Sequence, residues 1–307
     1  MGPTAERSGT AREQPVPALR AVQAAVLDTD GVITDSARLH AAAWKTAFDA
    51  CLRDHPPADP ALRHPFTAGD YRRHVDGRAR LDGAAAFLDA RGLRLPAGEP
   101  GDPPGTGTVR AVAALKERLF TERLRAGGAE AYPGTVRLLR ALERAGIPRA
   151  AASASRHAGE LLAAAGVRGM FDALVDGHES ARLGLPGKPD PALFLEAADR
   201  LGRAPGDSAL FEDALAGVDA GRRGGFGLVV GVDRTEGGAA GEELRRYGAD
   251  IVVTDLAELL TAPDARAAPN PGADRNPGAD RNPGPAPNPG HAASGPTARP
   301  RTGEGPA

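Results

Sequence analysis

The stretch VQAAVLDTDG at residues 22–31 decides the fold of this chain. Its apolar part, residues 22–27, has the length and composition of a buried strand, and the residues that follow are polar and turn-prone. Two carboxylates, Asp28 and Asp30, therefore stand at the carboxyl end of the predicted strand. One carboxylate of such a pair can attack an electrophile or bind a cation while the other transfers a proton.

Taken alone, this acidic turn has two other interpretations. An EF-hand loop that starts at Asp28 would need an oxygen ligand at its fifth position and Glu at its twelfth, where the chain has Val32 and Leu39. A calcium loop is therefore excluded. An Asp-rich turn that only caps the following helix stays open at this point.

The pattern of an apolar strand with a polar end recurs along the chain. Four further strands are predicted, at residues 147–152, 209–211, 228–230 and 251–253. Segments with helical periodicity lie between the strands, at residues 134–145, 156–165, 191–201, 214–223 and 242–247. This alternation predicts an α/β fold, a Rossmann-like parallel sheet with helices on both faces. Ligands bind such sheets at the carboxyl ends of the strands, where this chain carries Asp, Ser and Glu.

Residues 37–127 interrupt the alternation. Helices are predicted there at residues 37–52, 81–90 and 109–125, with a loop rich in Pro and Gly at 96–107. We therefore expect an inserted α-helical cap domain over residues 37–127. The α/β core would consist of residues 21–36 and 128–262.

The two ends of the chain lack the apolar residues of a core. Residues 1–20 are polar, contain no run that resembles the hydrophobic part of a signal peptide, and are expected to be a disordered leader. Residues 263–307 include 11 prolines but no Val, Ile, Leu, Met, Phe, Trp, Tyr or Cys. We expect a disordered tail there, because such a segment cannot bury enough apolar surface to offset its loss of entropy.

The composition excludes several classes of protein. With 40 acidic and 38 basic residues, the net charge of -2 gives no field for holding polyanions, so we expect no nucleic-acid partner. No apolar run approaches the ~20 residues that span a bilayer, so no membrane partner is expected either. The single cysteine, Cys51, excludes an internal disulfide and a Cys-rich zinc site, and is expected to be a buried thiol. A cytoplasmic protein is expected.

Further polar groups follow the acidic turn in order along the chain. Ser153, Lys188 and the pair Glu212 and Asp213 each stand at or just after a predicted strand end or loop. A hydroxyl and an ammonium suit the oxygens of a phosphate, and carboxylates suit a hard divalent ion such as Mg²⁺. Together with the acidic turn, these groups predict phosphoryl transfer.

Five motifs carry a resemblance to a known family. They are DTDGVITD at 28–35, YPG at 132–134, SASRH at 153–157, GKPDP at 187–191 and FEDALAGVDAGRRGGFGLVVGVDR at 211–234. On these motifs the chain resembles the haloacid dehalogenase-like (HAD) phosphotransferase superfamily, and within it the β-phosphoglucomutase-like hydrolase branch. The resemblance spans residues 21–260. It implies the HAD fold, a Rossmann-like core with an inserted helical cap.

The resemblance implies roles for the residues in these motifs. Asp28 would be the nucleophile that becomes an aspartyl-phosphate, and Asp30 the general acid and base. Ser153, Ala154 and Lys188 would bind the oxygens of the transferred phosphoryl group. The acidic residue at position 30 also argues against a carbon–halogen hydrolase, because that branch usually has no acid two positions after the nucleophile.

The resemblance also implies Mg²⁺ as the cofactor. Its ligands would be the carboxylate of Asp28, the backbone carbonyl of Asp30 and the carboxylate of Asp213, with Glu212 bound directly or through water. The physical chemistry agrees, because a phosphate and Asp28 repel each other. Mg²⁺ and Lys188 would lower this repulsion before attack.

Candidates for substrate recognition also follow from the resemblance. Arg80, in the motif GRARLD, is the candidate for gripping a second, non-reacting phosphate; the alternative is an exposed arginine that pairs with Asp82. Ser155, Arg156 and His157 would face the sugar. The last two stand where the mutase pattern has Lys and Asn, so they do not identify the sugar.

Three more candidates lie on predicted helices of the insert. His40 and Trp44 are four residues apart and share one helix face, and the branch has a His and a Trp near its reaction centre. For both, packing within the insert is the alternative. Lys116 stands where the branch often has a basic residue that faces the site, against the alternative of a solvated helix face.

The sequence therefore favours a Mg²⁺-dependent phosphotransferase that works through an aspartyl-phosphate on a small-molecule sugar phosphate. The favoured reaction is the isomerisation of β-glucose 1-phosphate to glucose 6-phosphate. A phosphatase that transfers the aspartyl-phosphate to water is the alternative, because it shares every core residue. An inactive scaffold whose tail binds a partner is a third interpretation, although all the expected catalytic residues are present. We expect a monomer.

Overall fold

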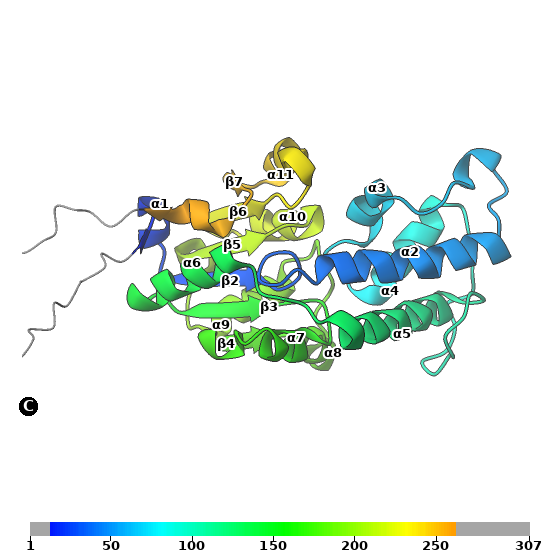
Figure 1. Cartoon of the computed structure of the whole chain (residues 1–307), viewed down its shortest axis with the longest axis horizontal. Helices are drawn as coiled ribbons and strands as arrows, with labels where there is room; N and C mark the ends of the chain where they lie inside the picture. Colours follow the sequence, from blue (N-terminus) through cyan, green and yellow to red (C-terminus); the bar gives the residue numbers. More distant parts are fainter. Residues whose placement is uncertain (1–12, 262–307) are drawn as a thin grey trace, which may run out of the picture. The chain divides into compact units, whose positions relative to one another are not determined.

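The computed structural model describes residues 13–261, and within them six parallel strands form the central sheet (Figure 1). The strand order is β4-β3-β2-β5-β6-β7. In chain order, the strands are β2 (Ala24–Asp28), β3 (Arg149–Ala152), β4 (Ala173–Val175), β5 (Ser208–Glu212), β6 (Leu228–Val232) and β7 (Ile251–Val253). Strand β2, which carries the acidic turn, lies in the middle of the sheet between β3 and β5.

Both faces of the sheet are covered by helices. Every residue of β2 is buried, and its side chains alternate between two separate apolar clusters. Ala25 and Leu27 pack in the cluster of α6 and α7, and Val26 packs in the cluster of α9, α10 and α11. These helices and the short α8 have the bounds α6 (Pro133–Arg144), α7 (Ala158–Ala164), α8 (Gly177–Leu183), α9 (Ala192–Arg200), α10 (Leu215–Arg223) and α11 (Gly241–Tyr247).

The predicted α/β fold is confirmed. All five predicted strands and all five predicted helices of this region are present, with ends shifted by a few residues. Strand β4 and helix α8 are additional elements that the sequence patterns did not predict. Strand β4 is an edge strand of three residues, too short to show a period, and its partner β3 lies more than 20 residues earlier in the chain.

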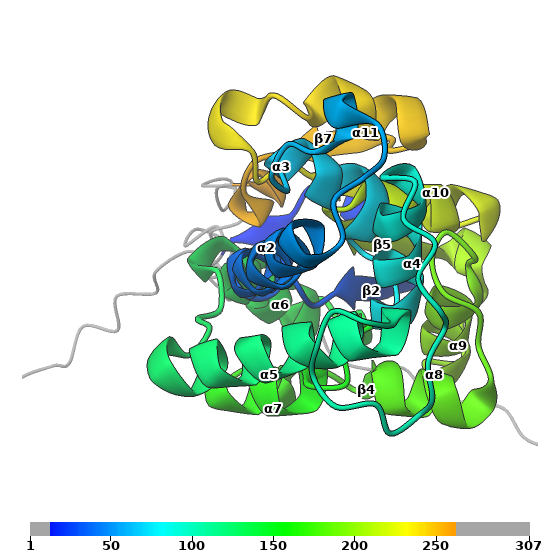
Figure 2. The same cartoon turned by 90° about the vertical axis from the view of Figure 1, so that its right-hand side faces the viewer.

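The insert is built from helices around its own apolar cluster. Its three long helices are α2 (Ala37–Asp54), α4 (Arg80–Ala90) and α5 (Val109–Gly127), and they face the viewer in Figure 2. Shorter helical turns lie between α2 and α4, namely Pro60–Leu62, α3 (Ala68–Asp70) and Tyr71–Val75. Trp44, Phe48, Phe66 and Phe87 are at the centre of the cluster. The assignment of residues 37–127 to a separate domain stays a prediction.

A smaller apolar cluster joins the insert to the core. Leu39 of α2 and Phe120 of α5 pack there with Leu161 of α7. This contact holds the inner ends of α2 and α5 above the carboxyl edge of the sheet, and it thereby sets which residues of α5 face that edge.

The prediction of a disordered leader is wrong for residues 13–20. Strand β1 (Gln14–Pro15) pairs antiparallel with β8 (Leu260–Thr261), and helix α1 (Pro17–Arg20) follows it. Leu19 is completely buried in the sheet cluster. Neither the distant pairing partner nor the burial of one leucine is visible in the local sequence. Residues 1–12, and the predicted tail after residue 261, lie outside the described residues.

Two predictions from the composition concerned membrane spans and the single cysteine, and the described residues bear on both. None of their helices combines the length and the apolar character that a membrane span requires. Cys51 is buried as expected, and burial raises the pKa of its thiol to about 11.

Candidate active site

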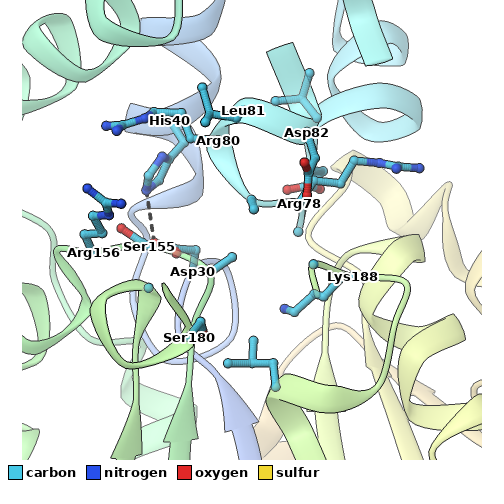
Figure 3. Close-up of a pocket in the computed structure, with 18 of the residues that line it drawn as sticks. Asp30, His40, Arg78, Arg80, Leu81, Asp82, Ser155, Arg156, Ser180 and Lys188 are labelled. Atoms are coloured by element: carbon cyan, nitrogen blue, oxygen red, sulfur yellow. Dashed lines mark ion pairs between the residues drawn. The ribbon is translucent and has the colours of Figure 1, made fainter. Parts of the chain in front are cut away.

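A cavity of about 310 Å³ lies between the carboxyl edge of the sheet and the insert (Figure 3). Asp28, Asp30 and Lys188 line it from the side of the sheet. Trp44, Arg80, Lys116 and Glu117 line it from the insert. Residues that are 160 positions apart in the chain, such as Asp28 and Lys188, thus meet at one place, as expected for the edge of a parallel sheet.

Lys188 is the centre of the sheet side. Its ammonium donates to Asp28 Oδ1 at 2.5 Å and to Glu212 Oε1 at 2.6 Å, and the three side chains are almost completely shielded from solvent. Glu212 accepts a further hydrogen bond from the backbone N–H of Ala214. Burial alone would lower the pKa of Lys188, but the charges of Asp28 and Glu212 outweigh it and raise the pKa. Lys188 therefore stays charged next to the predicted nucleophile.

Two glycines make room for the acidic side chains. Gly31 has φ +80°, and a Cβ built there would lie 1.7 Å from Asp213 Oδ2. A Cβ on Gly217 would lie 1.7 Å from Glu212 Oε1. Because both contacts are far below van der Waals distance, any larger residue at either position would displace a carboxylate of the site.

Asp30 accepts hydrogen bonds from two hydroxyl groups. Ser36 Oγ donates to its Oδ1, and Ser153 Oγ donates to its Oδ2 at 3.2 Å. His40 Nε2 lies 3.4 Å from Asp30 Oδ1 (Figure 3, dashed line). Burial acts to raise the pKa of Asp30, but His40 and Ser36 outweigh it and lower that pKa. In this state Asp30 is a carboxylate that can take up a proton.

His40 connects Asp30 to Lys116. Lys116 Nζ lies 2.8 Å from His40 Nδ1, and the lysine is only 3% exposed, so it does not lie on a solvated helix face. Because an ammonium can only donate, Nδ1 is assigned as the acceptor and Nε2 carries the proton that faces Asp30. Burial lowers the pKa of Lys116 to about 8. His40 also stacks on Phe120 with ring centroids 4.0 Å apart.

Arg80 pairs with Glu117 rather than with Asp82. Its Nη1 contacts Glu117 Oε2, while Glu117 Oε1 lies 2.5 Å from His157 Nε2. The Nε–H of Arg80 is buried and has no hydrogen-bond partner among the described residues. His157 therefore contacts the insert through Glu117, and it is not among the residues that line the cavity.

The remaining predicted residues differ in whether they line the cavity or are buried beneath it. Ala154, Ser155 and Arg156 line the cavity, whereas Ser153 is completely buried behind Asp30 and also accepts the backbone N–H of Ser155. Trp44 combines both of its interpretations: its ring stacks on Phe48 within the insert, and its side chain also lines the cavity. The roles of all the predicted site residues stay predictions.

Several residues of the site were not predicted from the sequence, and two of them are charged groups with close partners. Glu117 is one, and Asp76, which lines the cavity just before α4, is the other. Burial and the nearby charge of Glu212 raise the pKa of Asp76 to about 7. A charged residue on or next to a predicted helix is ordinarily interpreted as solvated, because no sequence pattern shows which neighbour it will meet.

The acidic groups around Lys188 carry more negative charge than its ammonium can balance. Asp28, Asp76, Glu212 and Asp213 lie close enough to act on one another, and Lys188 is the cation that contacts two of them. Burial, followed by the charges of Asp76 and Glu212, raises the pKa of Asp213 well above its usual value. Among the described residues no three ligating side chains converge on one point. The chemistry of the donors nevertheless fits a divalent cation that prefers oxygen ligands, because such an ion would neutralise this excess of carboxylates.

Comparison with known proteins identifies the family of this chain. The family model "haloacid dehalogenase-like hydrolase" matches residues 22–225. The β-phosphoglucomutases of Mycobacterium bovis and Mycobacterium tuberculosis are 43% identical over 240 residues, which cover 78% of this chain and 92% of each relative.

Solved structures show the same fold. A hydrolase from Pseudomonas syringae superimposes with a TM-score of 0.60 at 24% identity, over 77% of this chain and 95% of that one. A β-phosphoglucomutase from Clostridium difficile has a TM-score of 0.58 at 23% identity, over 78% of this chain and 93% of that one. The site, the family model and the mycobacterial relatives lead to one conclusion. The chain is an enzyme of the phosphotransferase and phosphatase type and belongs to the haloacid dehalogenase-like superfamily, in its β-phosphoglucomutase-like branch.

Proposed function

We propose that this enzyme is a Mg²⁺-dependent phosphotransferase that acts on a sugar phosphate through an aspartyl-phosphate at Asp28. The favoured reaction is the interconversion of β-glucose 1-phosphate and glucose 6-phosphate, the reaction named for its mycobacterial relatives. The observation that carries the proposal is the cavity with Asp28 and Lys188 at one wall and Arg80 at the other. A sugar with a phosphate at each end would find a partner for both.

The proton balance of the reaction follows from Asp30. When a sugar hydroxyl attacks the aspartyl-phosphate, a new O–P bond forms, the bond between phosphorus and Asp28 breaks, and Asp30 takes the hydroxyl proton. In the second half, Asp28 attacks the other phosphate, and Asp30 returns the same proton to the leaving sugar oxygen. Asp30 is ionised, as the first half requires. The hydrogen bonds from Ser36 and Ser153 orient it.

Lys188 would hold the transferring group at Asp28. Its ammonium already contacts the Asp28 carboxylate, and it would also bind the phosphoryl oxygens. Glu212 fixes the position of this ammonium from the opposite side. Without a buried cation, the approach of a phosphate to Asp28 would be opposed by the repulsion of two anions.

Mg²⁺ would be held by Asp28, the carbonyl of Asp30 and Asp213, with Glu212 close by. When bound, it would neutralise charge on the transferring phosphoryl group. We expect a chelator to stop turnover, Mg²⁺ to restore it, and Ca²⁺ to fail, because Ca²⁺ tolerates more ligands and longer bonds. Full turnover after removal of divalent ions, checked by elemental analysis, would refute this ligand assignment.

A specific observation keeps a sugar-phosphate phosphatase as the second candidate. Arg80, the candidate for the second phosphate, is already paired with Glu117. If no second phosphate replaces Glu117, the aspartyl-phosphate would be transferred to water instead. The cytoplasmic location and the monomeric state stay predictions.

One assay separates the two candidates. Purified enzyme with Mg²⁺ is given β-glucose 1-phosphate, with and without a trace of glucose 1,6-bisphosphate, while glucose 6-phosphate and free phosphate are measured separately. A mutase forms glucose 6-phosphate with little free phosphate and is stimulated by the bisphosphate. Free phosphate in proportion to the substrate consumed would identify a phosphatase, and the absence of both products would reject the sugar-phosphate assignment.

A further inference from the structure

Two neighbouring residues of α5 line the cavity and contact different partners. Lys116 contacts His40 and, through it, the reaction centre at Asp30. Glu117 contacts Arg80 and His157. The helix therefore presents a cation to His40, next to Asp30, and an anion to Arg80, the candidate for binding a second phosphate.

The carboxylate of Glu117 links three segments. Oε2 contacts Arg80 of α4, and Oε1 contacts His157, which follows β3 in the core. The Glu117 side chain is 27% exposed, so this pair of contacts is partly shielded from water, unlike most surface ion pairs. Burial acts to raise the pKa of Glu117, but His157 and Arg80 outweigh it and lower that pKa. A charged carboxylate thus joins the insert to the core.

The same carboxylate contacts Arg80, the candidate for binding a second phosphate. Arg80, Glu117, Ser155 and Arg156 all line the cavity. A phosphate that bound Arg80 and the 153–157 loop would come close to the charge of Glu117, which repels it. The buried Nε–H of Arg80 has no partner among the described residues, so Arg80 can still donate to an incoming anion.

We propose that Glu117 is a specificity-determining residue that competes with the second phosphate of the substrate for Arg80. While no phosphate is there, the Glu117 carboxylate holds the insert against the core. A sugar bisphosphate must displace it, whereas a ligand that occupies only the reacting end leaves it in place. The competition between Glu117 and a second phosphate rests on the proposed function. The contact that Glu117 makes between the insert and the core does not.

The test compares Glu117→Gln with Glu122→Gln. Glutamine keeps the size and hydrogen-bonding capacity of Glu117 but removes its charge. Glu122 is a matched control, because it lies on the same helix, is 61% exposed and has only a long contact of 3.8 Å with Arg118 among the described residues. Both changes are made in an Asp28→Asn background, so that ligand binding is measured without turnover.

The first measurement is calorimetric binding of glucose 1,6-bisphosphate and of inorganic phosphate, both with Mg²⁺. We expect Glu117→Gln to lower the Kd of the bisphosphate, relative to that of inorganic phosphate, by about tenfold, because one repelling charge is gone. We expect no change in this ratio for Glu122→Gln. If the Kd of the bisphosphate, divided by that of inorganic phosphate, is unchanged or higher in Glu117→Gln, Glu117 does not compete with the second phosphate.

The second measurement is hydrogen exchange of the ligand-free protein. Glu117→Gln should raise the exchange rates of the 153–157 loop and of the first turn of α4, and Glu122→Gln should not. His157→Gln should do the same, and the double variant should add little, because both changes break one contact. Equal hydrogen-exchange rates in Glu117→Gln and the parent would show that Glu117 does not hold the insert against the core. If neither the Asp28→Asn parent nor the wild-type protein binds a sugar bisphosphate, the proposed function is rejected, and the exchange data still decide whether Glu117 links the insert to the core.

Discussion

The sheet side and the insert side of the cavity carry their charges in different ways. On the sheet side, Lys188 is buried between Asp28 and Glu212, and both carboxylates stand at the ends of strands. On the insert side, Arg80 and Glu117 project from helices and remain about one third exposed. A charge at a strand end is fixed by the sheet itself, whereas a charge on a packed helix can exchange its partner. This difference suits the sheet side to chemistry and the insert side to recognition.

The largest effect is expected when the buried cation is removed. Lys188→Ala leaves Asp28 and Glu212 buried without a counter-charge, and it should cost about 3–5 kcal/mol of unfolding free energy as well as turnover. Urea denaturation measures the stability. Lys45→Ala is the control, because that lysine is 54% exposed in its pair with Asp49 and should cost less than about 1 kcal/mol. Similar losses of unfolding free energy in both variants would show that the buried ion pairs of Lys188 contribute no more than the exposed pair of Lys45 and Asp49.

The next effect concerns Asp28, the proposed nucleophile. Asp28→Asn is nearly isosteric, so the fold should persist, but an amide can neither attack phosphorus nor serve as an anionic metal ligand. Turnover should fall below about 1 per cent of wild type, which corresponds to about 2.7 kcal/mol. Steady-state assay, with circular dichroism as the check on folding, measures this. A folded variant with higher turnover would remove Asp28 from this role.

Arg80→Ala tests the insert side directly. Loss of a charge-assisted contact should cost about 2–4 kcal/mol of transition-state stabilisation for a sugar bisphosphate, read from kcat/KM. For acetyl phosphate, which has one phosphate, the loss should be at least tenfold smaller. Arg118→Ala, an exposed arginine on α5, is the control. Equal losses on both substrates would mean that Arg80 supports the insert or the chemistry rather than the second phosphate.

The smallest effect is a dependence of stability on pH. The pKa of Lys116 is lowered by burial to about 8, so between pH 8 and its unfolded value the unfolded chain binds more protons than the folded one. The stability of wild type should therefore rise with pH in this window, relative to Lys116→Met, by about 1–3 kcal/mol. Urea titrations of both proteins at pH 7 and pH 10 measure the difference. A constant difference between the two proteins would show that Lys116 keeps an ordinary pKa.

The same contrast explains what could be predicted from the sequence. Asp28 and Glu212 directly follow apolar runs, so the predicted strand ends are enough to place them at the carboxyl edge of the sheet. Glu117 and Asp76 follow no such run. The position of Glu117 at the cavity depends on how α5 packs through Phe120 against Leu161, a contact between residues 41 positions apart.

Strands β1 and β4 were not predicted from the sequence, for a related reason. Strand β1 is two residues long and takes its partner from the other end of the described chain, where Gln14 meets Thr261. Strand β4 has only three residues. In both places a tertiary contact, rather than local periodicity, defines the element, and a single sequence carries no record of that contact.

The pairing of β1 with β8 also places the two ends of the described chain side by side. Residues 14 and 261 are paired neighbours, and Figure 1 shows them at the end of the sheet away from the insert. A short linker could join them, and new termini could then be opened in the loop between α4 and α5. Such a circular permutant should keep the core while removing the direct connection between α4 and α5, so that Arg80 and Glu117 are joined in sequence only through the core and the linker. Its affinity for phosphate, compared with that for a bisphosphate, would show how far recognition depends on the continuity of the insert.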